Sequence, residues 1–335
     1  MLKQYLQKFF ANKFYPTTKR DWYAEKGYVG NNDQEKFINF LQNQQFEGEK
    51  FHTEFQSVNL SRQFISSTED TVLDSVMISP NKFNNKTIVN KNLYFIFFQG
   101  RGEYYESRFR DMAIQAYKTG ANVIGFNPKG FCSSTGNTQK LSDIVEDGIA
   151  VIKYLMDTYK LNSNQIILQG NSLGGGVQEM VSEYFRKNYN YHFRQINSNS
   201  FKNLSAVIAC SYKIPFLEYI IKPILLYAGW EIITNRNFYS TGIYRCVLRR
   251  LNDRTILKEA EFFHMINIEN DNKNCPNEYC KINKWLYENC QLTLDDDEID
   301  PHLPSLNHFY FTYKDYRYSV YELINIYINE SNKYV

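Results

Sequence analysis

Cysteine is scarce in this sequence, and its spacing excludes two classes of protein. Six cysteines occur in 335 residues, and no two of them form a C-x-x-C pair. A disulfide-stapled scaffold carries far more cysteines for its length, and zinc ribbons and thiol redox sites use C-x-x-C pairs. We therefore expect reduced thiols, no bound metal and no cofactor.

An excess of charge of one sign is also missing. Lys and Arg number 38 against 36 Asp and Glu, which gives a net charge of +2, and no long basic run occurs. Nucleic-acid binding is therefore not expected. Hydrophobic residues make up 43% of the chain and aromatic residues 16%. This composition supports a large buried core and excludes a disordered chain.

Long uncharged hydrophobic runs are absent as well. The most apolar stretch, residues 214–233, contains two prolines, two glutamates and one lysine. A membrane-spanning helix needs about 20 predominantly apolar residues. The first residues, from Met1, contain no apolar core of a signal peptide. We expect no transmembrane segment and no Sec signal, hence a cytoplasmic protein or one exported by another route.

What is present, from Leu93 onward, is an alternation of short apolar runs and helical patterns. This alternation is typical of βαβ units and predicts an α/β fold with a mostly parallel sheet flanked by helices. Strands are predicted at 93–98, 122–126, 165–169, 204–209, 262–268 and 291–294. Helices are predicted at 107–118, 141–159, 173–187, 277–289 and 318–328.

Two regions depart from the alternation. Residues 1–70 are predicted to form an extension that begins with an amphipathic helix, and the segments around 55–64 and 72–78 to form antiparallel edge strands. Residues 71–335 then form the main domain. Within it, residues 211–260 interrupt the alternation and have hydrophobic helices of their own, so a helical cap inserted after the sixth strand is expected.

The sharpest local signal is the pattern Gly170-Asn171-Ser172-Leu173-Gly174. It follows the predicted strand 165–169 directly and precedes a predicted helix, which is the context that a G-x-S-x-G nucleophile turn requires. The small residues are needed because the strained turn brings neighbouring backbone close to both positions. The plainer alternative is a glycine-rich turn in which Ser172 only caps the helix.

With this motif the chain resembles the α/β-hydrolase superfamily over roughly residues 70–335, and two further loops carry the likeness. The segment 97–102, Phe-Phe-Gln-Gly-Arg-Gly, is similar to the H-G-x-G oxyanion loop, with Gln99 in place of His. The segment 127–136, Asn-Pro-Lys-Gly-Phe-Cys-Ser-Ser-Thr-Gly, is similar to the R-G-x-G-x-S-x-G loop, with Cys132 in place of Gly. The loop pattern also resembles lipase-like hydrolases that intracellular bacteria such as Legionella and Coxiella deliver to host cells.

The resemblance implies a catalytic role for several positions. Ser172 is the expected nucleophile, and the backbone N–H groups of Leu173 and Arg101 are the expected oxyanion donors. The expected acid is Asp271, at the end of the strand 262–268, and the expected base is His302, in the loop before the last helix.

The pairing of Asp297 with His308 is the alternative triad. It leaves only about ten residues for the intervening helix and strand, which is less than a βαβ crossover needs. Asp271 is therefore preferred, and both pairings stay open at this stage.

The cap segment bears on the substrate. Gly100 and Gly102, together with the cap residues Ile220, Leu225 and Trp230, are expected to contact it. The apolar cap predicts an acyl pocket or a surface that lies on a membrane, although helices packed on the sheet would show the same pattern. Likewise, the N-terminal apolar stripe with its lysines suits anionic lipid, but packing against the body is the preferred interpretation.

Together these features predict a serine hydrolase that cleaves a carboxylic ester or thioester with an apolar acyl group. The expected partner is a small-molecule or lipid ester, with peripheral membrane contact as an open prediction and no prediction of oligomeric state. A peptidase or amide hydrolase is the alternative among enzymes. A binding protein that keeps the fold without catalysis is the alternative outside them.

Overall fold

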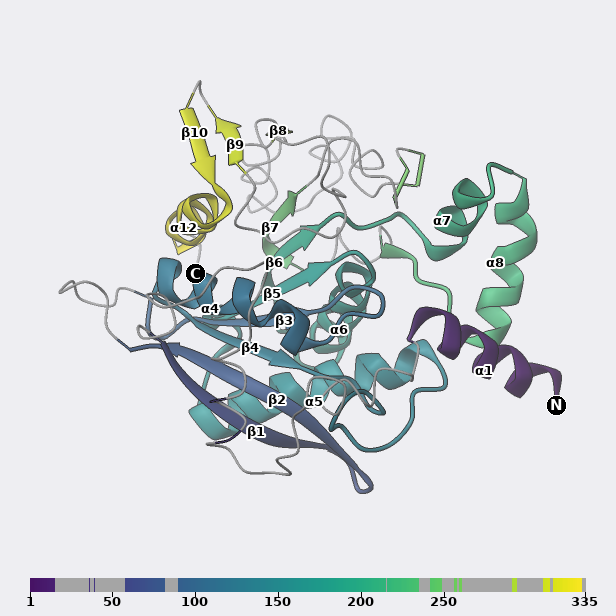
Figure 1. The fold of residues 1–335 in the computed structure, drawn as a ribbon, viewed down its shortest axis with the longest axis horizontal. Helices are drawn as coiled ribbons and strands as arrows, with labels where there is room; N and C mark the ends of the chain where they lie inside the picture. The colour runs from purple at the N-terminus through teal and green to yellow at the C-terminus, as the bar shows by residue number, and fades with distance from the viewer. Residues whose placement is uncertain are drawn as a thin grey trace.

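The computed structural model describes residues 1–15, 36, 39, 58–81, 90–214, 216–234, 242–248, 256–257, 259–260, 291–293, 310–313 and 316–332. In this part of the chain a seven-stranded sheet has the order β1-β2-β4-β3-β5-β6-β7 (Figure 1). From β4 to β7 neighbouring strands run parallel, whereas β2 is antiparallel to β1 and β4. Its strands are β1 (Val58–Thr68), β2 (Thr71–Pro80), β3 (Tyr94–Phe98), β4 (Asn122–Phe126), β5 (Ile166–Asn171), β6 (Phe193–Ser198) and β7 (Gly242–Leu248).

Helices cover both faces of this sheet. Ile96 and Phe98 of β3 join the core beneath α5 (Leu141–Tyr159) and α6 (Leu173–Tyr189). Phe95 and Phe97 join the core beneath α4 (Phe109–Thr119) and α12 (Val320–Ser331). Successive strand residues point to opposite faces, so one apolar run supplies both cores. The predicted α/β class with a mostly parallel sheet is confirmed. The bounds of the short helices η3 and η4 are Tyr105–Arg108 and Ser163–Gln165.

One predicted strand is wrong. Residues 204–209 form helix α7 (Leu204–Ser211), and the sixth strand is β6 instead. Asn203 caps the helix, since its side-chain oxygen accepts a hydrogen bond from the Ala206 N–H at 2.7 Å. A short apolar run fits a strand or a buried helix equally well. Here the cap and the Glu231 carboxylate, which accepts from the Leu204 and Ser205 N–H groups, stabilise the start of the helix.

A second correction concerns the predicted strand 291–294. It is present as β8 (Gln291–Thr293), but it pairs antiparallel with β9 (Tyr310–Tyr313) rather than joining the parallel sheet. β9 pairs in turn with β10 (Tyr316–Ser319), so these strands form a separate three-stranded sheet. The predicted strand 262–268 and helix 277–289 lie outside the described residues.

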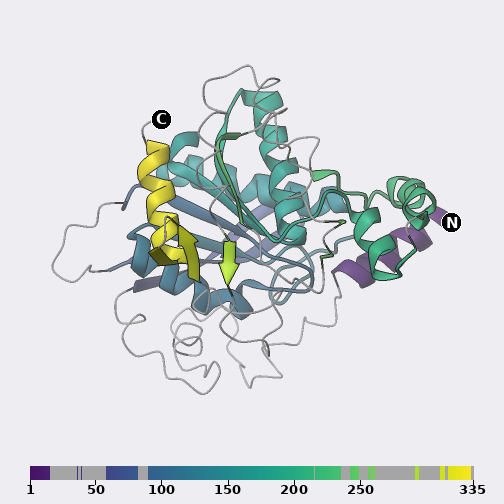
Figure 2. The ribbon, with the colours of Figure 1, turned by 90° about the horizontal axis from the view of Figure 1, so that it is seen from above.

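Three helices lie together beyond one side of the sheet. α1 (Leu2–Phe14), α7 and α8 (Leu217–Ala228) project from the body in both views (Figures 1 and 2). α7 and α8 connect β6 to β7, and β7 itself falls within the segment expected to form a cap. No helix among the described residues is long and apolar enough to cross a membrane.

Candidate active site

Ser172 occupies the single position between β5 and α6, and its backbone is strained. Its φ of 52° and ψ of −116° are values that a non-glycine residue rarely adopts, at a cost of about 1–3 kcal/mol. Contacts from β6 and beyond hold the turn. The Ser172 N–H donates to the Ser198 carbonyl at 2.9 Å, and the Ser200 hydroxyl donates to the Ser172 carbonyl at 3.1 Å. The chain therefore maintains a strained serine at the carboxyl edge of the sheet.

The two glycines of the motif are sterically required. A Cβ built on Gly170 would lie 2.6 Å from the carbonyl oxygen of Gly174. A Cβ built on Gly174 would overlap the carbonyl group of Phe98 and lie 2.6 Å from the carbonyl oxygen of Gln99. Real Cβ atoms do not approach backbone so closely, so the G-x-S-x-G spacing follows from this packing.

The loop after β3 lies directly beside the turn. β3 and β5 are neighbours, with Phe98 opposite Gly170 in the register. The close approach of Gly174 to the Phe98 and Gln99 carbonyls places the start of α6 against this loop. A Cβ on Gly100 would lie 3.3 Å from the side-chain nitrogen of Asn171. The two segments expected to supply oxyanion donors are therefore in contact.

Glu103 fixes the conformation of this loop. Its carboxylate accepts a hydrogen bond from the Gly100 N–H at 2.6 Å and pairs with Arg108 at 2.6 Å. The Gly100 N–H is engaged in this way, and the next N–H along the loop belongs to Arg101. The Arg101 side chain is exposed, and its Nε donates to the Lys13 carbonyl at 3.0 Å. Glu103 stands out in the sequence only as an acid three residues after Gly100.

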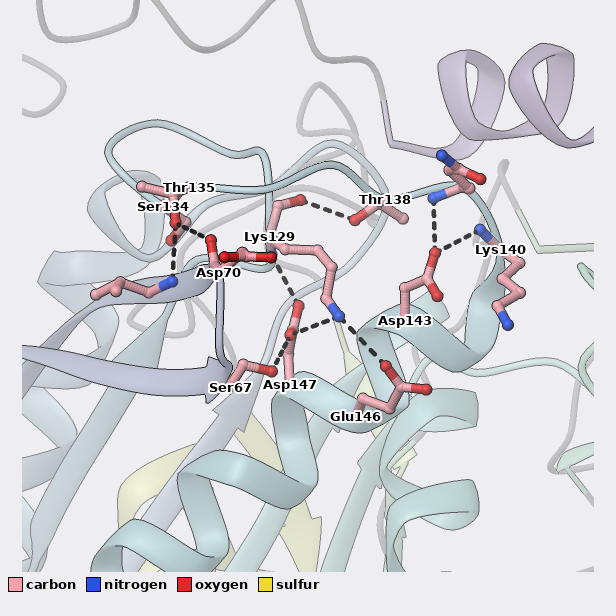
Figure 3. A network of polar contacts seen from close by, with 12 residues as sticks. Ser67, Asp70, Lys129, Ser134, Thr135, Thr138, Lys140, Asp143, Glu146 and Asp147 are labelled. Carbon is pink, nitrogen blue, oxygen red and sulfur yellow. Dashed lines mark hydrogen bonds and ion pairs between the residues drawn. The ribbon is translucent and has the colours of Figure 1, made fainter.

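A second loop, after β4, is tied to β1 and α5 (Figure 3). The buried carboxylate of Asp147 accepts hydrogen bonds from the Lys129 N–H at 2.8 Å and from the Ser67 hydroxyl at 2.7 Å. The Lys129 ammonium lies 3.4 Å from Asp147 and 3.4 Å from Glu146. Burial raises the pKa of the Asp147 carboxyl to about 6, although Lys129 and Ser67 oppose this shift. In the sequence, Asp147 stands out only as an acid among the apolar residues of the predicted helix 141–159, which does not reveal its partners.

The same loop is fastened to β2. The Ser134 hydroxyl accepts from the Asp74 N–H at 2.8 Å and donates to the Asn127 carbonyl at 2.8 Å. Gly130 and Gly136 have left-handed φ values of 83° and 80°, which favour glycine. The loop that resembles the R-G-x-G-x-S-x-G segment therefore uses its glycines for turns and its serine to anchor the loop.

Comparison with known proteins places the chain in a family. The family model described as Chlamydia CHLPS protein (DUF818) matches residues 39–238, which is more than half of the chain. The chain belongs to this family. No curated protein matches the CHLPS-family sequence described here.

Solved structures show the fold of this CHLPS-family protein. An α/β-hydrolase from Vibrio vulnificus matches with a TM-score of 0.50 at 14% identity, over 72% of this chain and 74% of that one. A Pyrococcus furiosus esterase matches with a TM-score of 0.47 at 15% identity, over 68% of this chain and 82% of that one. A Pyrobaculum calidifontis esterase matches with a TM-score of 0.43 at 15% identity, over 74% of this chain and 77% of that one. The match to the Vibrio vulnificus structure and the mostly parallel sheet show that the CHLPS-family chain has the α/β-hydrolase fold.

The expected cap contacts do not meet at one surface of the CHLPS-family protein. Leu225 and Trp230 are buried in the core, where the Trp230 ring packs 5.7 Å from that of Phe14 and its Nε1 donates to the Gln139 carbonyl. Ile220, by contrast, is 52% exposed. Neither buried side chain is open to a substrate in this structure, so an acyl-binding role for these cap residues stays a prediction.

Of the other predicted site residues, some lie within the described part of the chain and some outside it. Gly102 lies in the loop beside the Ser172 turn with a φ of 65°, and Leu173 is the first residue of α6. The first N–H groups of a helix have no acceptor within it. The alternative carboxylates and histidines, Asp271, Asp297, His302 and His308, all lie outside the described residues. Among the residues that are described, no cluster of His, Cys, Asp and Glu suits a metal ion.

A buried carboxyl just beyond the Gly100 loop makes stability depend on pH. Glu106 is buried and accepts two hydrogen bonds from the Asn127 side-chain nitrogen, at 2.9 and 3.0 Å. Burial raises its pKa from 4.5 to about 8, against the effect of Asn127. The folded state therefore holds this proton more tightly than the unfolded chain. The stability that comes from the protonated Glu106 carboxyl is fully present below pH 4.5 and is lost as the pH rises through 8.

We expect Glu106→Gln to remove most of this dependence between pH 6 and 9. At pH 9 the variant should be more stable than the wild type, by on the order of 2–4 kcal/mol, because it never ionises but loses one of the two hydrogen bonds from Asn127. Urea unfolding at pH 6 and pH 9 measures the effect. Glu69→Gln, at an exposed position in the turn between β1 and β2, serves as the control. If the unfolding free energy of Glu106→Gln fell with pH as steeply as that of the wild type, the group that loses its proton in this range would not be Glu106.

Proposed function

We propose that this protein is a serine hydrolase that cleaves a carboxylic ester or thioester with an apolar acyl group. The Ser172 hydroxyl attacks the carbonyl carbon while His302 takes its proton, and Asp271 orients His302. The backbone N–H groups of Leu173 and Arg101 stabilise the oxyanion. His302 then protonates the departing alcohol or thiol, and water releases the acyl group by the reverse sequence.

The observation that carries this proposal is the strained backbone of Ser172. A helix-capping serine needs no positive φ, because an N-cap residue normally has extended backbone. Ser172 has a φ of 52° and makes no side-chain cap hydrogen bond to α6. Strain of this kind is kept where function requires it. The Gly100–Gly102 loop lies beside this serine, as acyl transfer requires.

The apolar acyl part of the proposal rests on the helices that follow β6. They leave the sheet at the carboxyl edge, where Ser172 lies, and α8 carries few charges. Hydrolysis of p-nitrophenyl esters of increasing acyl length tests this part. We expect saturable hydrolysis that favours acyl chains longer than acetyl. A folded wild type that hydrolyses none of these esters would contradict the proposal.

The acid of the triad is tested by two matched variants. We expect Asp271→Asn to lower kcat by about 10⁴-fold, because the amide no longer fixes the histidine tautomer. Asp297→Asn should change kcat only slightly. A larger loss of kcat in Asp297→Asn than in Asp271→Asn would contradict this assignment. If His308→Ala then lost more activity than His302→Ala, Asp297 and His308 would be the acid and the base of the triad.

A further inference from the structure

The outward face of α8 is apolar, which is the reverse of an ordinary surface helix. Positions 216, 219, 220, 223, 226 and 227 follow the spacing of one helix face. None of them carries a charge, and the row includes Pro223. Their side chains are largely exposed: Phe216 (66%), Tyr219 (84%), Ile220 (52%), Leu226 (55%) and Tyr227 (53%). Single exposed apolar side chains are normal, but a continuous row indicates an interaction surface.

Helix α1 extends this surface. Its Leu6, Phe10 and Phe14 pack on the body, and Phe14 meets Trp230 at the end of α8. A second stripe, Leu2 (65%), Tyr5 (67%) and Phe9 (52%), remains exposed. The Lys3 ammonium lies 5.7 Å from the centre of the Tyr227 ring, so the two exposed stripes adjoin. We call the exposed residues of α1 and α8 the α1/α8 surface.

Lysines outnumber acids in the segments that form the α1/α8 surface. Residues 1–15 contain Lys3, Lys8 and Lys13, all exposed, and no acid. Residues 204–230 contain Lys213 and Lys222 with Glu218 as their only acid. Glu218, in the first turn of α8, already has partners. Its carboxylate accepts a hydrogen bond from the Asn203 side chain at 3.1 Å and pairs with the Lys202 ammonium at 3.5 Å. The next acid, Glu231, is buried and accepts hydrogen bonds from the Leu204 and Ser205 N–H groups. The exposed charges of these two segments are therefore mostly lysines.

We propose that the α1/α8 surface docks onto an anionic lipid membrane. Helices that lie in the interface combine a large apolar face with lysines that reach the lipid headgroups. The tyrosines fit the same location, since their rings are apolar and their hydroxyls bind water and headgroups. Figure 2 shows these helices projecting from the body, an arrangement that suits contact with a flat bilayer. This docking is independent of the proposed hydrolysis.

Flotation of the full-length protein with lipid vesicles tests the docking. We expect at least tenfold tighter binding to vesicles of phosphatidylcholine with phosphatidylserine than to phosphatidylcholine alone, and weaker binding as salt rises. Tyr219→Ser with Ile220→Ser should weaken binding about tenfold or more. Lys3→Gln with Lys8→Gln should weaken it by a similar factor.

Matched controls lie elsewhere on the molecule. Phe64→Ser changes an exposed aromatic residue on the edge strand β1, and Lys91→Gln an exposed lysine before β3. Both should bind vesicles as the wild type does, and so should Ser172→Ala, which separates docking from hydrolysis. All variants change exposed side chains except Ser172→Ala, which removes only one hydroxyl. The melting temperature of each variant checks that it is folded.

Three results would overturn the docking proposal. A folded wild type that floats with neither kind of vesicle would do so. Equal binding to neutral and anionic vesicles would remove the role of the lysines. A wild-type dimer in sedimentation that becomes monomeric in Tyr219→Ser with Ile220→Ser would show that a second copy of the chain covers the surface instead.

Discussion

Ser172→Ala is expected to lower kcat for ester hydrolysis by about 10⁵-fold or more. In serine hydrolases the nucleophile and its base act as a unit, and removing either one loses nearly the whole effect. The variant should fold normally, because alanine can occupy the same turn and the Ser172 side chain makes no cap bond to α6. Ester hydrolysis and thermal unfolding, measured on the same preparation, check both parts.

A companion variant separates strain from chemistry. Ser172→Gly should be inactive as well, but more stable than Ser172→Ala by about 1 kcal/mol, because glycine adopts a φ of 52° without strain. Ser211→Ala, on the exposed end of α7, should keep full activity. Activity within tenfold of the wild type in Ser172→Ala would remove Ser172 from the mechanism.

Gly174→Ala should have the second-largest effect, on both stability and activity. Its Cβ would overlap the Phe98 carbonyl and press on that of Gln99, and neither backbone group can rotate away as a side chain would. Either α6 or the loop after β3 must shift. We expect a loss of about 3 kcal/mol or more in unfolding free energy. We also expect a loss of about 100-fold or more in kcat, because the proposed oxyanion donors would move.

Gly229→Ala is the matched control for this prediction. Gly229 has a left-handed φ of 77° at the end of α8, but an added Cβ would only approach that of Lys140 at 3.5 Å. Its expected cost is therefore the conformational strain alone, about 1 kcal/mol. Equal losses in the two variants would contradict the claim that contact with the Gly100 loop sets the requirement at Gly174.

The sequence predicts the Ser172 turn well because its determinants are local. The strand before it, the two glycines and the helix after it all lie within a short segment, and the structure has them at β5 and α6. β6 shows the opposite case. Its Arg194 is buried because distant groups satisfy it, the Ser331 hydroxyl at 3.0 Å and the Asn332 side-chain oxygen at 2.8 Å. A polar strand paired through tertiary contacts has no apolar pattern to read.

The supporting acids of the site were equally hard to foresee. Glu103 holds the loop beside Ser172 through the Gly100 N–H and Arg108, and Asp147 holds the loop after β4 through the Lys129 N–H and ammonium. Nothing in their spacing along the chain reveals these partners. The α1/α8 surface is a similar case, because an apolar helix stripe predicts burial and only the structure shows which stripe faces outward.

The central claim is that Ser172 is an activated nucleophile, and labelling with a fluorophosphonate tests it most directly. The probe reacts with a serine only where a neighbouring base has raised its nucleophilicity. We predict that peptide mapping of the labelled wild type finds the adduct on Ser172. The adduct should be lost in Ser172→Ala and nearly lost in His302→Ala. A folded wild type that takes up no label, or takes it up at another serine, would contradict the account.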